Sequence, residues 1–150
     1  MTTPPEPSNV HYPLRPILLV EDNPMDVDLT RRAFAKRNIL NPLEVARDGA
    51  EALEYLSRWD QGAPSPAVIL LDLNLPKISG LEVLRQIKTH ERWRVIPIVM
   101  LTTSSEHSDI REAYQYNVNS YIVKPVSFEK FMEVAVQIEL YWGVLNHVPL

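Results

Sequence analysis

Apolar residues are grouped along this chain in short blocks that predict strands separated by helices. Ile17–Val20 and Ala67–Leu71 are uninterrupted apolar runs, and such runs are typical of strands buried on both faces of a parallel sheet. Further apolar segments predict strands at 43–46, 96–101 and 121–123. Because Asp72 directly follows the central run, we expect its carboxylate at the carboxyl end of the third strand, where ligands of open α/β sheets bind.

Residues at helical spacing fill the intervals between these strands. The first helix is expected from Asn23-Pro24, an N-cap residue followed by proline, to about Asn38. Three further helices are marked by Ala52, Leu53 and Leu56; by Leu81, Leu84 and Ile87; and by Ile110, Ala113 and Tyr114. With a last helix after the fifth strand, the pattern predicts an α/β fold in which five helices cover both faces of a five-stranded parallel sheet.

The last predicted helix, from Ser127 to about Asn146, carries apolar residues on a face that should meet water. Its polar stripe is formed by Glu129, Lys130, Glu133 and Gln137. The next turn of the same stripe brings Leu140, Tyr141 and Val144 instead. An apolar patch that continues a polar face indicates a partner surface or a tail folding back, and we favour the partner.

Composition narrows the class of protein. Residues 1–14 are rich in proline and predict a loosely ordered tail, while 15–150 suit one domain that ends in the extended last helix and a short C-terminal tail. The chain has no cysteine, so we expect a cytoplasmic protein without disulfides. Its net charge of -4 and interspersed charges argue against nucleic-acid binding. No apolar run is long enough for a membrane span, and the N-terminus has neither a basic region nor an apolar core, so we expect no signal peptide.

The carboxyl ends of the predicted strands carry a set of polar residues that suits one chemistry. Glu21 and Asp22 follow the first strand, Asp72 the third, Thr102 the fourth and Lys124 the fifth. Three carboxylates in one crevice repel one another unless a cation joins them, and carboxylates with carbonyls and water are the ligands of Mg²⁺. A lysine ammonium and a threonine hydroxyl suit phosphoryl oxygens. The set therefore predicts that Asp72 attacks phosphorus to form an acyl phosphate.

Each of these residues also has a simpler explanation when it is taken alone. Glu21 and Asp22 could favour the positive end of the first helix, Thr102 could be a turn hydroxyl, and Lys124 could be a solvated surface charge. Their joint position at the strand ends makes these separate explanations less favoured.

The motifs resemble those of the receiver domain of bacterial two-component response regulators. They are E-D-N at 21–23, L-D-L-N-L-P-K-I-S-G at 71–80, L-T-T-S at 101–104 and Y-I-V-K-P at 121–125. The resemblance implies a flavodoxin-like doubly wound sheet in the order 2-1-3-4-5, and a signalling module that is no enzyme. It also implies that Asp72 is the phosphoacceptor and that the Mg²⁺ ligands are Glu21, Asp22, Asp72 and the Asn74 backbone carbonyl. Thr102 and Lys124 would bind the phosphoryl group, and Thr102 and Tyr121 would be the switch residues. Asn74 and Ser104 would occupy the variable positions that tune hydrolysis of the phosphate.

The chain is most similar, within that family, to stand-alone regulators that serve phytochrome histidine kinases. The long last helix with Tyr141-Trp142, the segment 117–121 and the lack of an output domain support this subfamily. It implies a histidine kinase partner of the phytochrome type and a homodimer formed by helix four, strand five and helix five. The apolar residues Leu140, Tyr141 and Val144 agree with such an interface.

Three other hypotheses fit less well. A haloacid-dehalogenase-like phosphatase needs an acid two residues after the nucleophile, where this chain has Asn74. A dinucleotide-binding domain needs a glycine-rich turn after the first strand, where this chain has Glu21-Asp22-Asn23-Pro24. A pseudo-receiver that docks without phosphorylation is disfavoured because every phosphorylation residue is present, and it remains the alternative.

Overall fold

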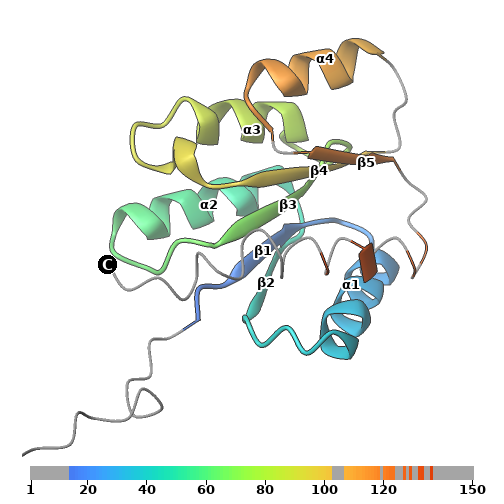
Figure 1. Cartoon of the computed structure of the whole chain (residues 1–150). Helices are drawn as coiled ribbons and strands as arrows, with labels where there is room; N and C mark the ends of the chain where they lie inside the picture. The colour runs from blue at the N-terminus through green and yellow to red at the C-terminus, as the bar shows by residue number, and fades with distance from the viewer. Residues whose placement is uncertain are drawn as a thin grey trace, which may run out of the picture.

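A parallel β-sheet forms the centre of the computed structural model (Figure 1), which describes residues 14–102, 107–118, 120–123, 127, 129, 132, 133 and 136, with the backbone alone at 102, 107–109, 120, 122 and 123. The strands are β1 Ile17–Val20, β2 Leu43–Ala46, β3 Val68–Asp72, β4 Ile98–Thr102 and β5 Ser120–Val123. They lie in the order β2-β1-β3-β4-β5, and every neighbouring pair is parallel. The doubly wound parallel fold expected from the sequence is therefore confirmed.

Helices cover both faces of this sheet. Their bounds are α1 Pro24–Lys36, α2 Gly49–Asp60, α3 Gly80–Lys88 and α4 His107–Gln115, with a short 3-10 helix η2 at Trp93–Val95. In Figure 1, α1 lies on one side of the sheet, and α2 and α3 lie on the other. Most of the predicted last helix falls outside the described residues, although 129, 132, 133 and 136 have helical backbone.

The alternation of side chains along the strands divides the core in two. Leu18, Ile69 and Met100 face α2 and α3, where they pack with Trp59 and Leu84. Their neighbours along the strands face the opposite way, and Ile17, Leu19, Val68, Leu70, Val99 and Leu101 pack against α1. Met132 contacts this second group, which agrees with the last predicted helix covering the α1 face. Because consecutive strand residues point to opposite faces, the two clusters share no buried residue among those described.

Side chains fix where the helices begin. The Asn23 side-chain oxygen accepts the Met25 N–H at 2.9 Å, and Pro24 occupies the first helical position, as predicted. Ser79 Oγ accepts the Glu82 N–H at 3.2 Å and starts α3 in the same way. These bonds satisfy N–H groups that have no partner within a helix, a contribution typically worth about 1 kcal/mol each.

Two boundaries differ by two residues from the predicted ones, whereas the strand bounds at Val68, Asp72, Thr102 and Ser120 differ by one. Helix α1 ends at Lys36 rather than near Asn38, because Asn38 adopts a left-handed backbone with φ 57°. Strand β4 begins at Ile98 rather than Ile96, because Ile96 caps η2 by donating its N–H to the Trp93 carbonyl at 3.1 Å. Ile96 is buried all the same, which explains why its position in an apolar run suggested a strand.

Asp60, at the end of α2, joins that helix to the segment after α3. Trp93 Nε1 donates to Asp60 Oδ1 at 2.8 Å, and His90 Nε2 lies 3.4 Å from the same oxygen. The indole rings of Trp59 and Trp93 meet edge to face with centroids 5.8 Å apart. These contacts hold the end of α2, from which the loop expected before β3 begins, against the segment after α3.

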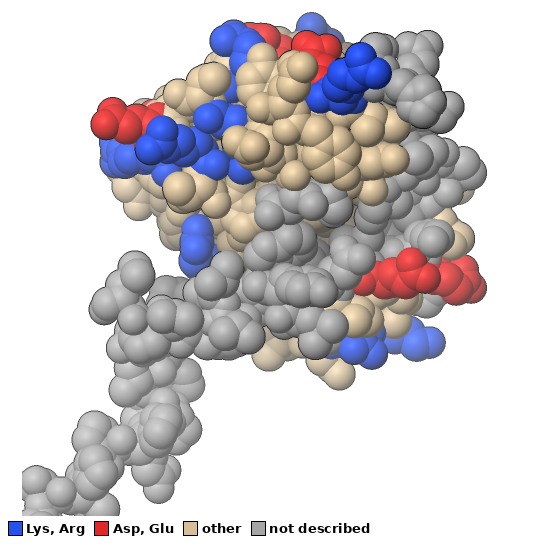
Figure 2. Space-filling model, turned by 45° about the horizontal axis from the view of Figure 1, so that its top comes forward, with Lys and Arg blue, Asp and Glu red and all other residues tan. Residues whose placement is uncertain are grey.

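The view in Figure 2 brings the α4 side forward and shows acidic side chains beside basic ones at several places on this face.

Candidate functional site

Three carboxylates meet at the carboxyl edge of the sheet. Glu21 follows β1 directly, and Asp72 is the last residue of β3, the neighbouring strand. Glu21, Asp22 and Asp72 each offer a carboxylate oxygen, and these atoms all lie within 4.8 Å of one another. Glu21 is 1% exposed and Asp72 3%, whereas Asp22 is exposed. The structure thus brings together the three acidic residues that the sequence placed at these strand ends.

Backbone N–H groups orient the two buried carboxylates. The Asn23 N–H donates to Glu21 Oε1 at 3.1 Å, and the Asn74 N–H donates to Asp72 Oδ1 at 3.0 Å. Both bonds span two residues and close a tight turn around an acidic side chain. The second turn holds Asn74, the residue expected to offer its backbone carbonyl, two positions beyond Asp72.

Electrostatic repulsion between these carboxylates is large enough to matter. Two unit charges 4.8 Å apart, the longest separation in the cluster, repel by about 3.5 kcal/mol at an effective dielectric constant of 20. A hard divalent cation removes that cost, and oxygen donors are the ligands it prefers. The donor set therefore fits Mg²⁺ or a similar ion held by one or two direct carboxylates.

Helix α3 packs closely against the backbone that carries Asp72. A Cβ added to Gly80 would lie 2.2 Å from the Asp72 carbonyl oxygen and 2.6 Å from Leu73 Cα. The Gly80 N–H donates to the Leu73 carbonyl at 3.0 Å. Only glycine allows this approach, because any side chain would collide with backbone rather than with a flexible group. The end of β3 is thereby fixed in position.

An ion pair fastens the loop after Asp72 to the start of α2. Lys77, which has a left-handed φ of 67°, places its Nζ 3.3 Å from Asp48 Oδ2. Asp48 also accepts the Glu51 N–H at 2.8 Å, and this bond, together with Lys77, lowers the pKa of its carboxyl. Neither this contact nor the presence of Asp48 and Lys77 beside the site was expected from the sequence. The only local signal was Asp48-Gly49, which indicates a turn.

Strand register places the backbone of Thr102 and the end of β5 near the same edge. Asp72 pairs with Leu101, so the backbone of Thr102 lies one position beyond it on β4. Thr102 in turn pairs with Val123, the residue before Lys124. The Thr102 side chain, Ser104 and Lys124 lie outside the described part of the chain, so their predicted roles stay predictions.

Tyr121, the expected switch aromatic, lies on β5 and is partly buried against the α2–α3 side of the core. Its ring meets that of Tyr114 on α4 edge to face, with centroids 5.8 Å apart. Tyr114 is 46% exposed, so this contact lies at the surface end of the core rather than within it. The expected interface residues Leu140, Tyr141 and Val144 fall outside the described residues.

Among the residues that the structure describes, no helix combines the length and the apolar character needed to cross a bilayer.

Comparison with known proteins gives a consistent family. The model of the response regulator receiver domain matches residues 17–136. Among curated proteins, the probable methanogenesis regulatory protein FilR2 of Methanothrix harundinacea is 48% identical over 134 residues, which are 89% of this chain and 86% of that protein. Response regulator Rcp1 of Synechocystis is 37% identical over 137 residues, 90% of this chain and 93% of that one.

Solved structures agree. The phosphorylated cyanobacterial phytochrome response regulator RcpA superposes with a TM-score of 0.78 at 37% identity, covering 91% of this chain and 99% of that one. The bacteriophytochrome response regulator AtBRR has a TM-score of 0.70 at 48% identity, covering 91% and 96%. The Mn²⁺-bound form of Rcp1 has a TM-score of 0.75 at 37% identity, covering 91% and 98%.

Proposed function

The chain belongs to the response regulator receiver domain family, and from this membership we propose that Asp72 accepts a phosphoryl group from a histidine kinase. The observation that carries the proposal is the convergence of the Glu21, Asp22 and Asp72 carboxylates within 4.8 Å at the edge of the sheet. Asp72 is buried, ends a strand, and is held by the Asn74 N–H. A carboxylate oriented in this way is suited to in-line attack on phosphorus.

Mg²⁺ is the cation that this donor set suits. We propose that Asp22 and Asp72 bind it directly, that Glu21 acts through water, and that the Asn74 backbone carbonyl completes the protein ligands. When bound, the ion neutralises charge on the carboxylates and on the phosphoryl oxygens. The Mn²⁺-bound form of Rcp1 supports a divalent cation in a related protein.

The transfer itself is a displacement at phosphorus. An Asp72 carboxylate oxygen forms the new P–O bond while the P–N bond to the kinase's phosphohistidine breaks, and the released imidazole nitrogen takes up a proton. We propose that the Thr102 hydroxyl and the Lys124 ammonium bind the phosphoryl oxygens. Strand register supports this assignment, because Thr102 ends β4 beside β3 and because β5 ends at Val123, the residue before Lys124.

The signal would leave through a surface rather than through catalysis. In this proposal Thr102 and Tyr121 change arrangement on phosphorylation, and helix four, strand five and helix five form the output face. Leu140, Tyr141 and Val144 would make a homodimer there. The receiver domain spans residues 15–150 and acts in the cytoplasm. Its partner is a histidine kinase of the phytochrome type, which the similarity to the phytochrome response regulator RcpA and the bacteriophytochrome response regulator AtBRR supports. A pseudo-receiver is the alternative function.

Phosphorylation is tested with a small phosphodonor. The full chain is incubated with acetyl phosphate, with Mg²⁺ or with a chelator, and its intact mass is measured. We expect a Mg²⁺-dependent gain of one phosphoryl group that Asp72→Asn abolishes. Asp28→Asn, an exposed aspartate on α1 that pairs with Arg32, serves as the matched control and should be labelled normally. Labelling that survives in Asp72→Asn would reassign the nucleophile, and no labelling under any condition would favour the pseudo-receiver.

The interface is tested separately by sizing in solution. Replacing Leu140 and Tyr141 by lysine should convert a dimer into a monomer, because like charges would face each other across the two-fold axis. An unchanged dimer would place the interface on another face. Comparing sizes with and without acetyl phosphate then shows whether phosphorylation changes the assembly.

A further inference from the structure

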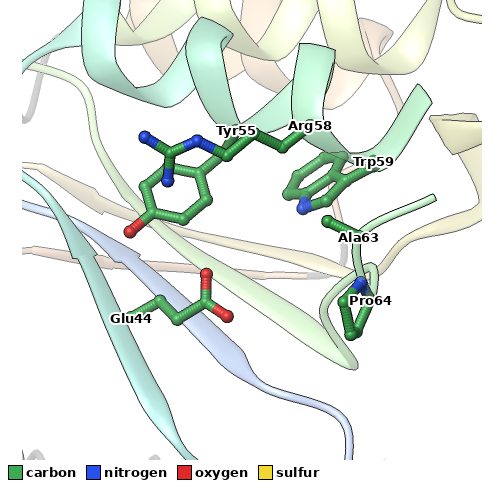
Figure 3. Close-up of a pocket in the computed structure, with 6 residues that line it drawn as sticks. All are labelled: Glu44, Tyr55, Arg58, Trp59, Ala63 and Pro64. Atoms are coloured by element: carbon green, nitrogen blue, oxygen red, sulfur yellow. The ribbon is translucent and has the colours of Figure 1, made fainter. Parts of the chain in front are cut away.

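A cavity of about 360 Å³ lies at the edge of the molecule opposite the carboxylates. Figure 3 shows that α2 forms one wall, β2 another, and the loop before β3 the third. Its lining consists of Glu44, Tyr55, Arg58, Trp59, Ala63 and Pro64. Glu44 is the second residue of β2, and Arg58 and Trp59 belong to the last turn of α2, so the cavity opens where the strands begin.

The chemistry of this cavity suits a proline-rich segment that carries a negative charge. The partly buried Tyr55 ring and the exposed Pro64 offer flat apolar surface, which is what grooves that bind polyproline helices present, whereas Trp59, at 3% exposed, adds little. The Arg58 guanidinium lies 4.7 Å from the centre of the Tyr55 ring. Its nearest acidic group, Glu54, is 4.0 Å away, and the Arg58 side chain is 56% exposed. Arg58 also interacts with the Tyr55 hydroxyl and with the charge of Glu44, and its exposed guanidinium keeps N–H groups that can pair with an incoming carboxylate.

The polar groups that line the cavity are already partly removed from water. Burial raises the pKa of the Glu44 carboxyl, although the charge of Arg58 opposes the shift. Burial also raises the pKa of the Tyr55 hydroxyl, and the charge of Glu44 adds to that effect. Partial dehydration lowers the cost of placing apolar rings against these groups.

A segment with the matching composition belongs to this chain and joins it beside the cavity. The described part begins at Leu14, and the next residue, Arg15, donates from its guanidinium to the Pro66 carbonyl at 2.7 Å and to Ser65 Oγ at 3.3 Å. Ser65 directly follows Pro64 of the lining. The described part of the chain thus begins next to the loop that forms one wall.

The sequence of this N-terminal segment provides both prolines and an acid. Pro4-Pro5-Glu6-Pro7 has the spacing of a polyproline ligand, with one carboxylate among its rings. The six residues from Ser8 to Pro13 can span up to about 20 Å, which is ample for a return to the neighbouring loop. A short tether also supplies an effective concentration in the millimolar range, so weak contacts suffice.

We propose that Pro4–Pro7 docks into this cavity of its own chain, with the prolines against Tyr55 and Pro64 and with Glu6 paired to Arg58. The docked segment covers the edge of the molecule that is opposite the proposed phosphorylation site. The proposal does not depend on phosphorylation of Asp72. A proline-rich segment of a second copy is the other occupant that the cavity would accept.

Paramagnetic broadening of amide signals tests the proposal in the full chain. The sequence has no cysteine, so Thr3→Cys gives a single site for a nitroxide label that lies beyond the prolines. We expect the amides of Tyr55, Arg58 and Ala63 to lose intensity selectively when the nitroxide is oxidised, compared with the reduced label. Even broadening over the whole surface, or broadening centred elsewhere, would overturn the proposal.

Charge variants give the matched controls. Arg58→Glu should abolish the selective broadening, and Glu6→Lys in the same chain should restore it. Arg31→Glu, an exposed arginine on α1, should leave it unchanged. Broadening that is indifferent to Arg58→Glu would contradict the assigned pairing.

Mixing two forms of the chain identifies the occupant. Spin-labelled chain without isotope is added to isotope-enriched chain without label, so that only contacts between molecules cause broadening. Loss of the Tyr55, Arg58 and Ala63 signals in this mixture would assign the cavity to a second copy and overturn docking within one chain. Unchanged signals in the mixture, with selective loss in the singly labelled chain, would support it.

Discussion

Asp72→Asn should change the stability of the chain with a sign that depends on Mg²⁺. Without the ion, Asp72 faces Glu21 and Asp22 with carboxylate oxygens no more than 4.8 Å apart. One such repulsion amounts to about 3.5 kcal/mol at an effective dielectric constant of 20. Hydrogen bonds to the native carboxylate, such as that from the Asn74 N–H, offset part of it. We therefore expect the substitution to raise the free energy of unfolding in chelator by about 1–3 kcal/mol.

Saturating Mg²⁺ should reverse the order of the two proteins. An ion that binds only the folded chain stabilises it by about 2.7 kcal/mol at a hundred times its dissociation constant. The native chain should gain that stability, whereas Asp72→Asn, which lacks one of the ligands, should gain much less. Asparagine keeps the shape of the side chain and an oxygen that can still accept the Asn74 N–H, so the comparison isolates the charge.

Urea denaturation with and without Mg²⁺ measures both effects. In thermal denaturation, each kcal/mol shifts the melting temperature of a chain of this size by about 2–4 °C. Asp28→Asn is the control, because it removes an exposed aspartate 3.0 Å from Arg32. Exposed pairs of this kind contribute well under about 1 kcal/mol, and this one lies outside the carboxylate cluster. If Asp72→Asn is no more stable than the native chain in chelator, or if Mg²⁺ stabilises both equally, the carboxylates do not form the charge cluster described above.

Further substitutions test the packing and the surface charges. Gly80→Ala should destabilise the chain by about 1–3 kcal/mol in urea denaturation and slow phosphorylation by acetyl phosphate, because its Cβ would lie 2.2 Å from the Asp72 carbonyl oxygen. Phe34→Ala, at a position 4% exposed, should cost about 3–5 kcal/mol, measured in the same way. Hydrogen bonds from Arg85 lower the pKa of Glu82 to about 2 from 4.5, so the stability they contribute is present above pH 4.5 and is lost as the pH falls toward 2. Glu82→Gln should flatten the acid limb of the stability profile in that window, and an unchanged acid limb would contradict the assignment.

The strands and their polar ends were predictable because their cause is local. Ile17–Val20 and Val68–Asp72 are buried on both faces, so each gives an unbroken apolar run that a sequence displays directly. Parallel strands then carry Glu21 and Asp72 to one edge without further information. The convergence of the carboxylates follows from two strand ends, each of which is visible in the sequence.

Contacts between distant segments were not predictable in the same way. The pair formed by Lys77 and Asp48 joins two loops and needs a lysine with a left-handed backbone, for which no propensity argues. The contact of Trp93 with Asp60 crosses 33 positions of the chain. Such contacts depend on the relative placement of helices, which hydrophobic spacing along one helix does not contain.

The division of the core by the sheet has a consequence for how such a sequence can diverge over time. Residues that pack against α1 and residues that pack against α2 and α3 form two groups with no buried member in common among those described. A substitution in one group can be compensated by a neighbour in the same group, without any change across the sheet. Two lineages could therefore repack one half of the molecule and inherit the other half unaltered. The residues at the carboxyl edge of the strands must remain compatible with the packing of both halves.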